Sequence, residues 1–65
     1  MKINKNIIWH IANIDGNKIT FILNCKTNDI FELNEDASEL FMDLINGKEL
    51  DEESYKMFKE CDICD

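Results

Sequence analysis

Residues 30–45 read IFELNEDASELFMDLI, and within them the spacing of apolar residues changes. Phe31 and Leu33 are two positions apart, which places both on one face of a short strand. The apolar residues that follow recur at intervals of three and four positions, as on a helix that packs along one side: Ala37, Leu40, Phe41, Leu44 and Ile45. We therefore predict a strand that ends at Leu33 and a helix that follows it directly.

The ends of this helix, and the start of a second one, carry residue types that cap helices. Asn34 can accept hydrogen bonds from the amides of the first turn, and Asn46-Gly47 supplies a stop. Asp51 predicts the N-cap of a second helix, which we expect to run to about Glu60.

Before residue 30 the chain alternates between apolar and polar residues, as strands do. Residues 7–14 and 18–25 form two such segments, joined at Asp15-Gly16, a turn signal because glycine accepts a positive φ angle. A polar turn at residues 26–29 leads to the third strand. The sequence therefore predicts an α+β fold, a three-stranded antiparallel meander followed by two helices, in one domain over residues 1–65. We expect its large apolar residues to be mostly buried: Trp9, Phe21, Leu23, Phe31, Leu33, Leu40, Phe41 and Leu44.

The length and the charge of the chain restrict its function. A core built from 65 residues rarely encloses an enzyme pocket, and no catalytic set of residues can be assembled, so we expect binding rather than catalysis. Residues 1–28 hold four lysines and one acid, a balance of +3, whereas residues 29–65 hold three lysines and 13 acids, a balance of −10. The resulting net charge of −7 disfavours binding to DNA or RNA.

The apolar runs and the cysteines indicate the cellular compartment of the protein. No apolar run approaches the roughly 18 residues that span a bilayer, and no signal-peptide core follows the N-terminus, so we expect a cytoplasmic protein with free thiols. Cys61 and Cys64 do have the C-x-x-C spacing of zinc, iron–sulfur or redox sites. The sequence has no second such pair, and we expect this chain end to fray. We therefore predict no metal site and no cofactor; the alternative is a small metal- or redox-linked protein that uses these two thiols.

The order of the elements and several motifs resemble PqqD-like domains, the recognition elements for ribosomally made precursor peptides. The resemblance covers residues 7–50, and the junction Leu33-Asn34-x-x-Ala37 is its most distinctive part; the residues that carry it are Trp9, Asp15-Gly16, the segment 28–34 (NDIFELN), Ala37, Leu40, Leu44 and Gly47. It implies a winged helix-turn-helix-like fold that binds the leader region of a precursor peptide. It also implies a separate modifying enzyme as partner, such as a radical-SAM maturase, a cyclase or a leader peptidase.

In domains of that family the leader adds as a strand beside the third strand, and a C-terminal helix forms the other wall of the groove. The third strand is an edge of the predicted meander, and an edge offers N–H and C=O groups that an extended peptide can satisfy. The expected peptide-binding residues are those of this strand and of the second helix: Asn28, Asp29, Ile30, Phe31, Glu32, Leu33, Tyr55, Phe58 and Lys59. A homodimer in which two such edges pair is the competing arrangement.

The chain departs from the family pattern in one respect. The family usually has a third helix, for which the residues after Glu60 are too few. Either the helix that begins after Asp51 forms the groove wall itself, or another protein or a second copy completes it. A winged-helix DNA-binding protein shares the fold, but the net charge argues against that role. His10 lies on the strand face opposite Trp9 with no predicted partner, so we assign it no chemistry.

Overall fold

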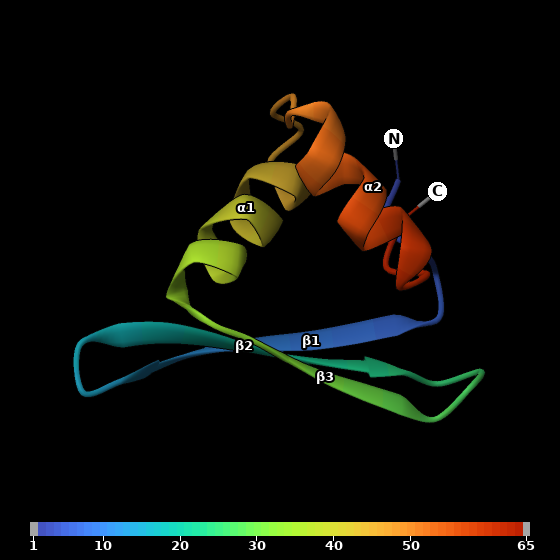
Figure 1. The fold of residues 1–65 in the computed structure, drawn as a ribbon. Helices are drawn as coiled ribbons and strands as arrows, with labels where there is room; N and C mark the ends of the chain where they lie inside the picture. Colours follow the sequence, from blue (N-terminus) through green and yellow to red (C-terminus); the bar gives the residue numbers. More distant parts are fainter. Residues whose placement is uncertain (1, 65) are drawn as a thin grey trace.

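The chain forms a three-stranded antiparallel sheet followed by two helices. The computed structural model describes residues 2–64. The strands are β1 (Ile7–Ile14), β2 (Asn17–Asn24) and β3 (Asp29–Leu33), and they lie in the order β1-β2-β3. The helices α1 (Glu35–Ile45) and α2 (Glu52–Glu60) both lie on one side of the sheet, so neither covers its other side (Figure 1). The predicted α+β fold is confirmed.

The two turns of the sheet take the conformations that their sequences favour. Asp15 and Gly16 have φ angles of 53° and 82°, and a two-residue hairpin turn of type I′ requires two such positive angles. In the second turn the side-chain oxygen of Asn24 accepts hydrogen bonds from the backbone N–H groups of Lys26 (3.0 Å) and Thr27 (3.3 Å). Asn24 is buried, so its side chain holds the turn that leads into β3 from the interior side.

The register of the two hairpins determines which face of each strand is buried. Trp9 pairs with Ile22 and Ile22 pairs with Phe31, so these three residues share the face that the helices cover. The buried residues of β2 all lie on this inner face: Thr20, Ile22 and Asn24. The prediction that Phe21 and Leu23 belong to the core is wrong. Both point to the outer face and are 38% and 36% exposed.

The core lies between the inner face of the sheet and the two helices. Phe41 of α1 is fully buried, and its ring centroid lies 5.6 Å from that of Trp9 and 6.1 Å from that of Phe58 of α2. Trp9 faces the helices as predicted, but it lies on an outermost strand and is 41% exposed, so its predicted burial is wrong. The other predicted core residues are buried or packed against the core: Phe31, Leu33, Leu40 and Leu44.

A buried pair of hydroxyl groups joins the sheet to α1. Thr20 Oγ1 donates a hydrogen bond to Ser38 Oγ at 2.7 Å, and Ser38 Oγ donates to the carbonyl oxygen of Leu33 at 3.2 Å. Thr20 and Ser38 are both 0% exposed. A buried hydroxyl is costly when it has no partner, so this chain of hydrogen bonds satisfies both groups and fixes α1 over the sheet.

Both helices begin at the caps that the sequence predicts. The side chain of Asn34 accepts a hydrogen bond from the N–H of Ala37 (2.9 Å), and that of Asp51 accepts one from the N–H of Ser54 (3.3 Å). Hydrogen bonds from the Ser54 hydroxyl and from its N–H lower the pKa of the Asp51 carboxyl below its ordinary value. Gly47, with a φ angle of 78°, follows the end of α1 as predicted.

The segment after α2 is held in the core. Asp62 takes a left-handed conformation (φ 58°), and the N–H of Ile63 donates to the carbonyl of Phe58 at 3.0 Å, which closes the helix in a Schellman turn. Ile63 and Cys64 are 1% and 4% exposed, and Cys64 forms a β-bridge with Ile3. The expectation that this chain end frays is therefore wrong, because its apolar side chains pack into the core beside the N-terminal segment.

Candidate functional site

β3 is an edge strand that pairs with β2 along one side. In an antiparallel strand the N–H and C=O of a residue point to the same side, and the side alternates along the strand. Just after β2, the N–H of Cys25 donates to the carbonyl of Asn6 (2.8 Å), so alternate residues of β2 bond to β1 and the residues between them, including Ile22, bond to β3. Phe31 is the partner of Ile22, so it directs its backbone groups to β2, as do its alternate neighbours in β3. The N–H and C=O groups of Ile30 and Glu32 therefore point to the free side.

The free side of β3 is a short template for strand pairing. It consists of the N–H and C=O groups of Ile30 and of Glu32. One end of the template is the turn at Asn28, where φ is 64°, and the other is the start of α1 at Asn34. An extended peptide bonded to these groups would run alongside the five residues of β3.

The side chains of β3 divide between the two faces of the sheet. Phe31 and Leu33 are half-buried on the inner face, whereas Ile30 (75% exposed) and Glu32 point to the outer face. The two residues nearest the turn, Asn28 and Asp29, are exposed. The six predicted site residues of this region thus follow one another along a single sheet edge.

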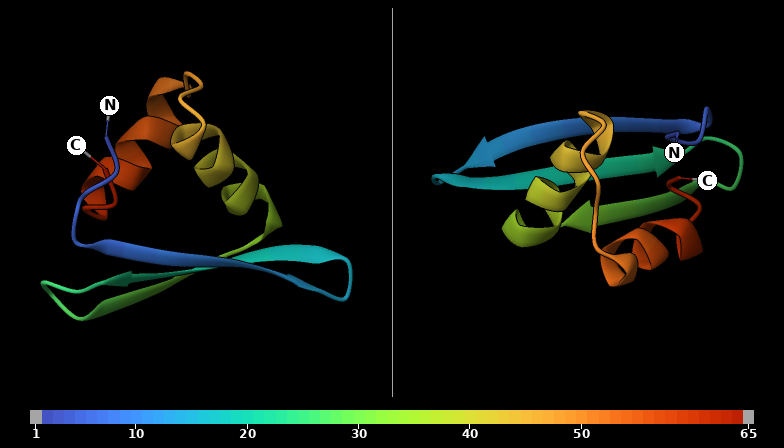
Figure 2. Two further views of the ribbon diagram at one scale, coloured as in Figure 1. Left: turned by 180° about the vertical axis from the view of Figure 1, so that it is seen from behind. Right: turned by 90° about the horizontal axis from the view of Figure 1, so that it is seen from above.

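α2 lies on the β3 side of the sheet (Figure 2). Tyr55 and Lys59 are one helical turn apart, and with Glu52 and Lys56 they line a surface hollow of 310 Å³. Tyr55 is half-buried and Lys59 is exposed. Phe58 corrects the sequence-based prediction: it is 1% exposed and packs on Phe41, so its ring supports α2 from inside and is not accessible to a peptide.

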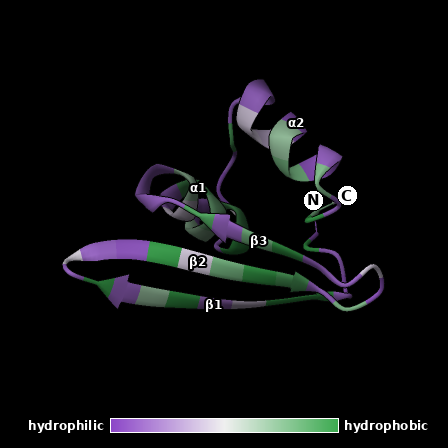
Figure 3. Cartoon of the chain, turned by 60° about the horizontal axis from the view of Figure 1, so that its bottom comes forward, coloured by the Kyte–Doolittle hydropathy of each residue, from purple (hydrophilic) through white to green (hydrophobic). Residues whose placement is uncertain are grey.

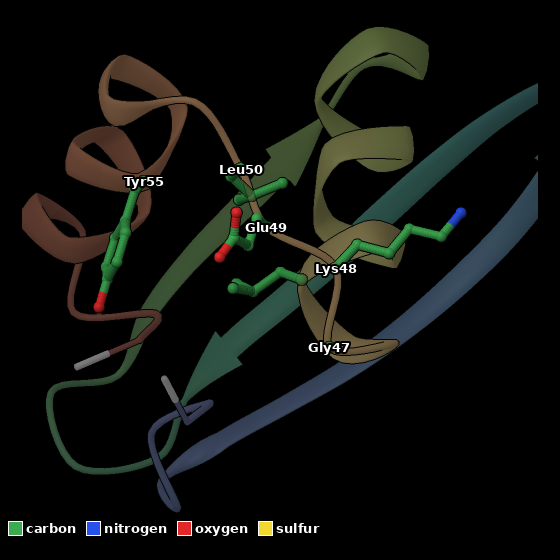
Figure 4. Close-up of a pocket in the computed structure, with 6 residues that line it drawn as sticks. Gly47, Lys48, Glu49, Leu50 and Tyr55 are labelled. Carbon is green, nitrogen blue, oxygen red and sulfur yellow. The ribbon is translucent and has the colours of Figure 1, made fainter.

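A larger hollow of 410 Å³ lies where the segment between the helices meets both of them (Figure 4). Its lining residues are Leu44, Gly47, Lys48, Glu49, Leu50 and Tyr55. Figure 4 shows the Lys48 side chain directed away from Tyr55, which also lines the smaller hollow. No residue of β3 lines either of these two hollows, so they are separate from the sheet edge.

Most of the acidic residues lie in the helical layer. Residues 35–64 hold ten acids and three lysines, whereas residues 2–34 hold three acids and four lysines. Two exposed ion pairs, Lys48–Asp43 (3.7 Å) and Lys56–Glu60 (4.0 Å), offset little of this charge. The helical layer therefore carries a negative potential that favours basic partners.

Cys61 and Cys64 lie at the C-terminal end of α2, where both are part of the packed structure. Cys61 is the C-cap of α2 and is half-buried, and Cys64 is buried in the core. Across residues 2–64 no three histidine, cysteine, aspartate or glutamate side chains are grouped so that they could hold a metal ion. The same residues include no helix that is both long and apolar enough to cross a lipid bilayer.

The outer face of the sheet is a surface that the sequence patterns did not reveal. It holds a shallow hollow of 240 Å³, and the outer-face residues that line it are Ile8, His10, Phe21, Leu23 and Ile30. Figure 3 shows this side of the sheet, with apolar residues along β1 and β2. The strand register is what brings Ile8, Leu23 and Ile30 side by side there.

Comparisons with known proteins find no match for this chain, whether against protein-family models, curated proteins or solved structures. Function is therefore inferred from the geometry of β3 and α2, the distribution of charge, and the motifs that resemble PqqD-like domains.

Proposed function

We propose that this chain is a non-catalytic domain that binds the leader region of a ribosomally made precursor peptide as an added strand beside β3. The observation that carries the proposal is the free side of β3, where the backbone N–H and C=O groups of Ile30 and Glu32 point away from β2. The resemblance to PqqD-like domains, with their winged helix-turn-helix-like fold, supports the same function.

Backbone pairing alone does not give tight binding. Four hydrogen bonds at about 0.5 to 1.5 kcal/mol each contribute roughly 2 to 6 kcal/mol, and association costs about 4 kcal/mol or more. Side chains of the leader must therefore supply further affinity. Those on the helix side would approach Tyr55, and those on the outer side would lie beside Ile30, which is 75% exposed.

The charge of the helical layer supports a basic leader. A peptide with lysine or arginine beside its apolar anchors would be attracted to α2, and this raises the association rate more than the affinity. We propose a cytoplasmic domain that leaves all chemistry to a separate radical-SAM maturase, cyclase or leader peptidase. The role of this domain is then to hold the leader in an extended form that the enzyme can bind.

An NMR titration tests this proposal. ¹⁵N-labelled protein is titrated with the synthetic leader of an adjacent precursor gene, and a scrambled leader of the same composition controls for charge alone. We expect amide shifts in residues 28–34 and 55–62 with the true leader and much weaker binding of the scrambled one. Shifts that cluster on β1 and leave both of those ranges unmoved would contradict strand addition at β3.

A further inference from the structure

We propose that the outer face of the sheet binds the same face of a second copy of this chain, around a two-fold axis that runs along β2. This inference goes beyond the proposed function and does not depend on it. The face consists of alternate residues of all three strands, and seven of its ten residues are apolar: Ile8, His10, Ala12, Ile14, Asn17, Ile19, Phe21, Leu23, Ile30 and Glu32.

The most exposed apolar side chains of the face form a continuous row. Ile8 pairs with Leu23 and Leu23 with Ile30 in the strand register, and these residues are 59%, 36% and 75% exposed. Phe21, at 38% exposed, lies two positions along β2 on the same face. Monomeric proteins rarely expose apolar groups that are contiguous in this way unless the surface binds something.

The register specifies how two such faces match. His10 and Glu32 flank Phe21 in one row across the sheet. A two-fold axis along β2 places β1 of one copy over β3 of the other, which brings each His10 opposite the partner copy's Glu32 and each Ile8 opposite the partner copy's Ile30. An axis that crosses the strands at this row would instead bring the two Glu32 carboxylates together. The first arrangement pairs an imidazole, which always has an N–H donor, with a carboxylate, whereas the second places like charges in contact.

The distribution of charge favours a second copy rather than an acidic or a basic partner. His10 and Glu32 are the ionisable groups among the ten residues of the face, whereas residues 35–64 hold ten acids and three lysines. Two sheets that pack face to face lie about 10 Å apart, with their strands crossing at about 30°. The acidic helical layers then lie at opposite ends of the dimer, where their mutual repulsion is weak.

The size of the face sets the strength of the association. Three strands at about 4.8 Å spacing and eight residues at about 3.3 Å each give a face of roughly 14 by 26 Å. Stable interfaces bury about 800 Å² on each partner, so this one belongs to the small, weakly associating class. The free side of each β3 is left open, so the dimer can bind two strands at its edges.

Sedimentation velocity across a concentration series tests the dimer. We expect the wild type to pass from monomer to dimer as its concentration rises to about 1 mM, in line with the weak affinity of small interfaces. Ile30→Lys should remain monomeric throughout that range and keep its melting temperature, because Ile30 is 75% exposed. The matched control Met57→Lys, which alters an exposed side chain of α2, should dimerise as the wild type does. A wild type that stays monomeric to the highest concentration, or an Ile30→Lys variant that still dimerises, would overturn the proposal.

Substitutions that change the charges at positions 10 and 32 test the direction of the two-fold axis of the dimer. Glu32→Lys should weaken dimerisation by about tenfold, since it replaces each His10 carboxylate partner with a cation, whereas Glu39→Lys on α1 makes the same change of net charge and should not. Adding His10→Glu to Glu32→Lys should restore the dimer. Intermolecular NOEs in a mixed labelled and unlabelled sample should join Ile8 of one copy to Ile30 of the other. NOEs that join two β3 backbones instead would show an edge-paired dimer and overturn this one.

Discussion

The inner and outer faces of the sheet differ in burial, and in β2 the buried face carries the more polar side chains. On the inner face β2 buries two polar side chains, Thr20 and Asn24, on either side of Ile22. On the outer face the same strand exposes Phe21 and Leu23. The inner polar groups are buried because each has hydrogen-bond partners, with Ser38 on α1 and with the backbone of the second turn.

This difference shows that strand register, and not the size of the side chains, determines the buried face. Once Phe31 and Leu33 face α1, the pairing of Phe31 with Ile22 fixes the orientation of every residue of β2. The large residues left on the outer face are then available to a partner. Substitutions of Ile22 and Leu23, and of the buried hydroxyl pair of Thr20 and Ser38, test this difference between the two faces.

The largest effect is expected from neighbouring substitutions on opposite faces. Ile22→Ala should lower the free energy of unfolding by about 2 to 5 kcal/mol, because the Ile22 side chain is 1% exposed and its removal leaves a cavity. Leu23→Ala should cost less than about 1 kcal/mol, because Leu23 already contacts water. Urea denaturation at a protein concentration that keeps the chain monomeric measures both values. Equal losses, or a larger loss for Leu23→Ala, would show that the faces are assigned the wrong way round.

A smaller effect is expected at the buried hydroxyl pair. Thr20→Val and Ser38→Ala should each cost about 1 to 3 kcal/mol, because each leaves the other hydroxyl with one partner fewer inside the protein. The double variant should be less destabilised than the sum of the two, since neither hydroxyl then remains to be satisfied. Strictly additive losses in the same denaturation experiment would mean that the two side chains do not interact.

Most of the fold follows from local patterns. The period change at Leu33, the caps at Asn34 and Asp51, and the Asp15-Gly16 turn each depend on a few neighbouring residues, and each prediction is confirmed. The face of β2 was assigned wrongly because large residues were taken as core residues without regard to register. The signal was nevertheless present in the sequence, because a two-residue turn after Ile14 already places Ile22 opposite Trp9.

The candidate site was predictable only in part. That β3 lies at an edge follows from strand order, which a meander fixes. Which of its backbone groups face outward depends on the register of both hairpins together, and this register leaves the groups of Ile30 and Glu32 on the free side. The burial of Phe58 was missed because its environment depends on how α2 packs on Phe41, a contact between separate elements.

Backbone N-methylation of a chemically synthesised chain tests the β3 edge most directly. A methyl group on the nitrogen of Glu32 removes an N–H that points away from β2, so it should leave the melting temperature unchanged and lower the affinity for the leader about tenfold or more. The same change at Phe31, whose N–H points toward Ile22 of β2, should instead lower the melting temperature. Calorimetric titration with the leader and thermal melts measure both quantities. If N-methyl-Glu32 binds the leader as tightly as the wild type does, the leader does not pair with β3.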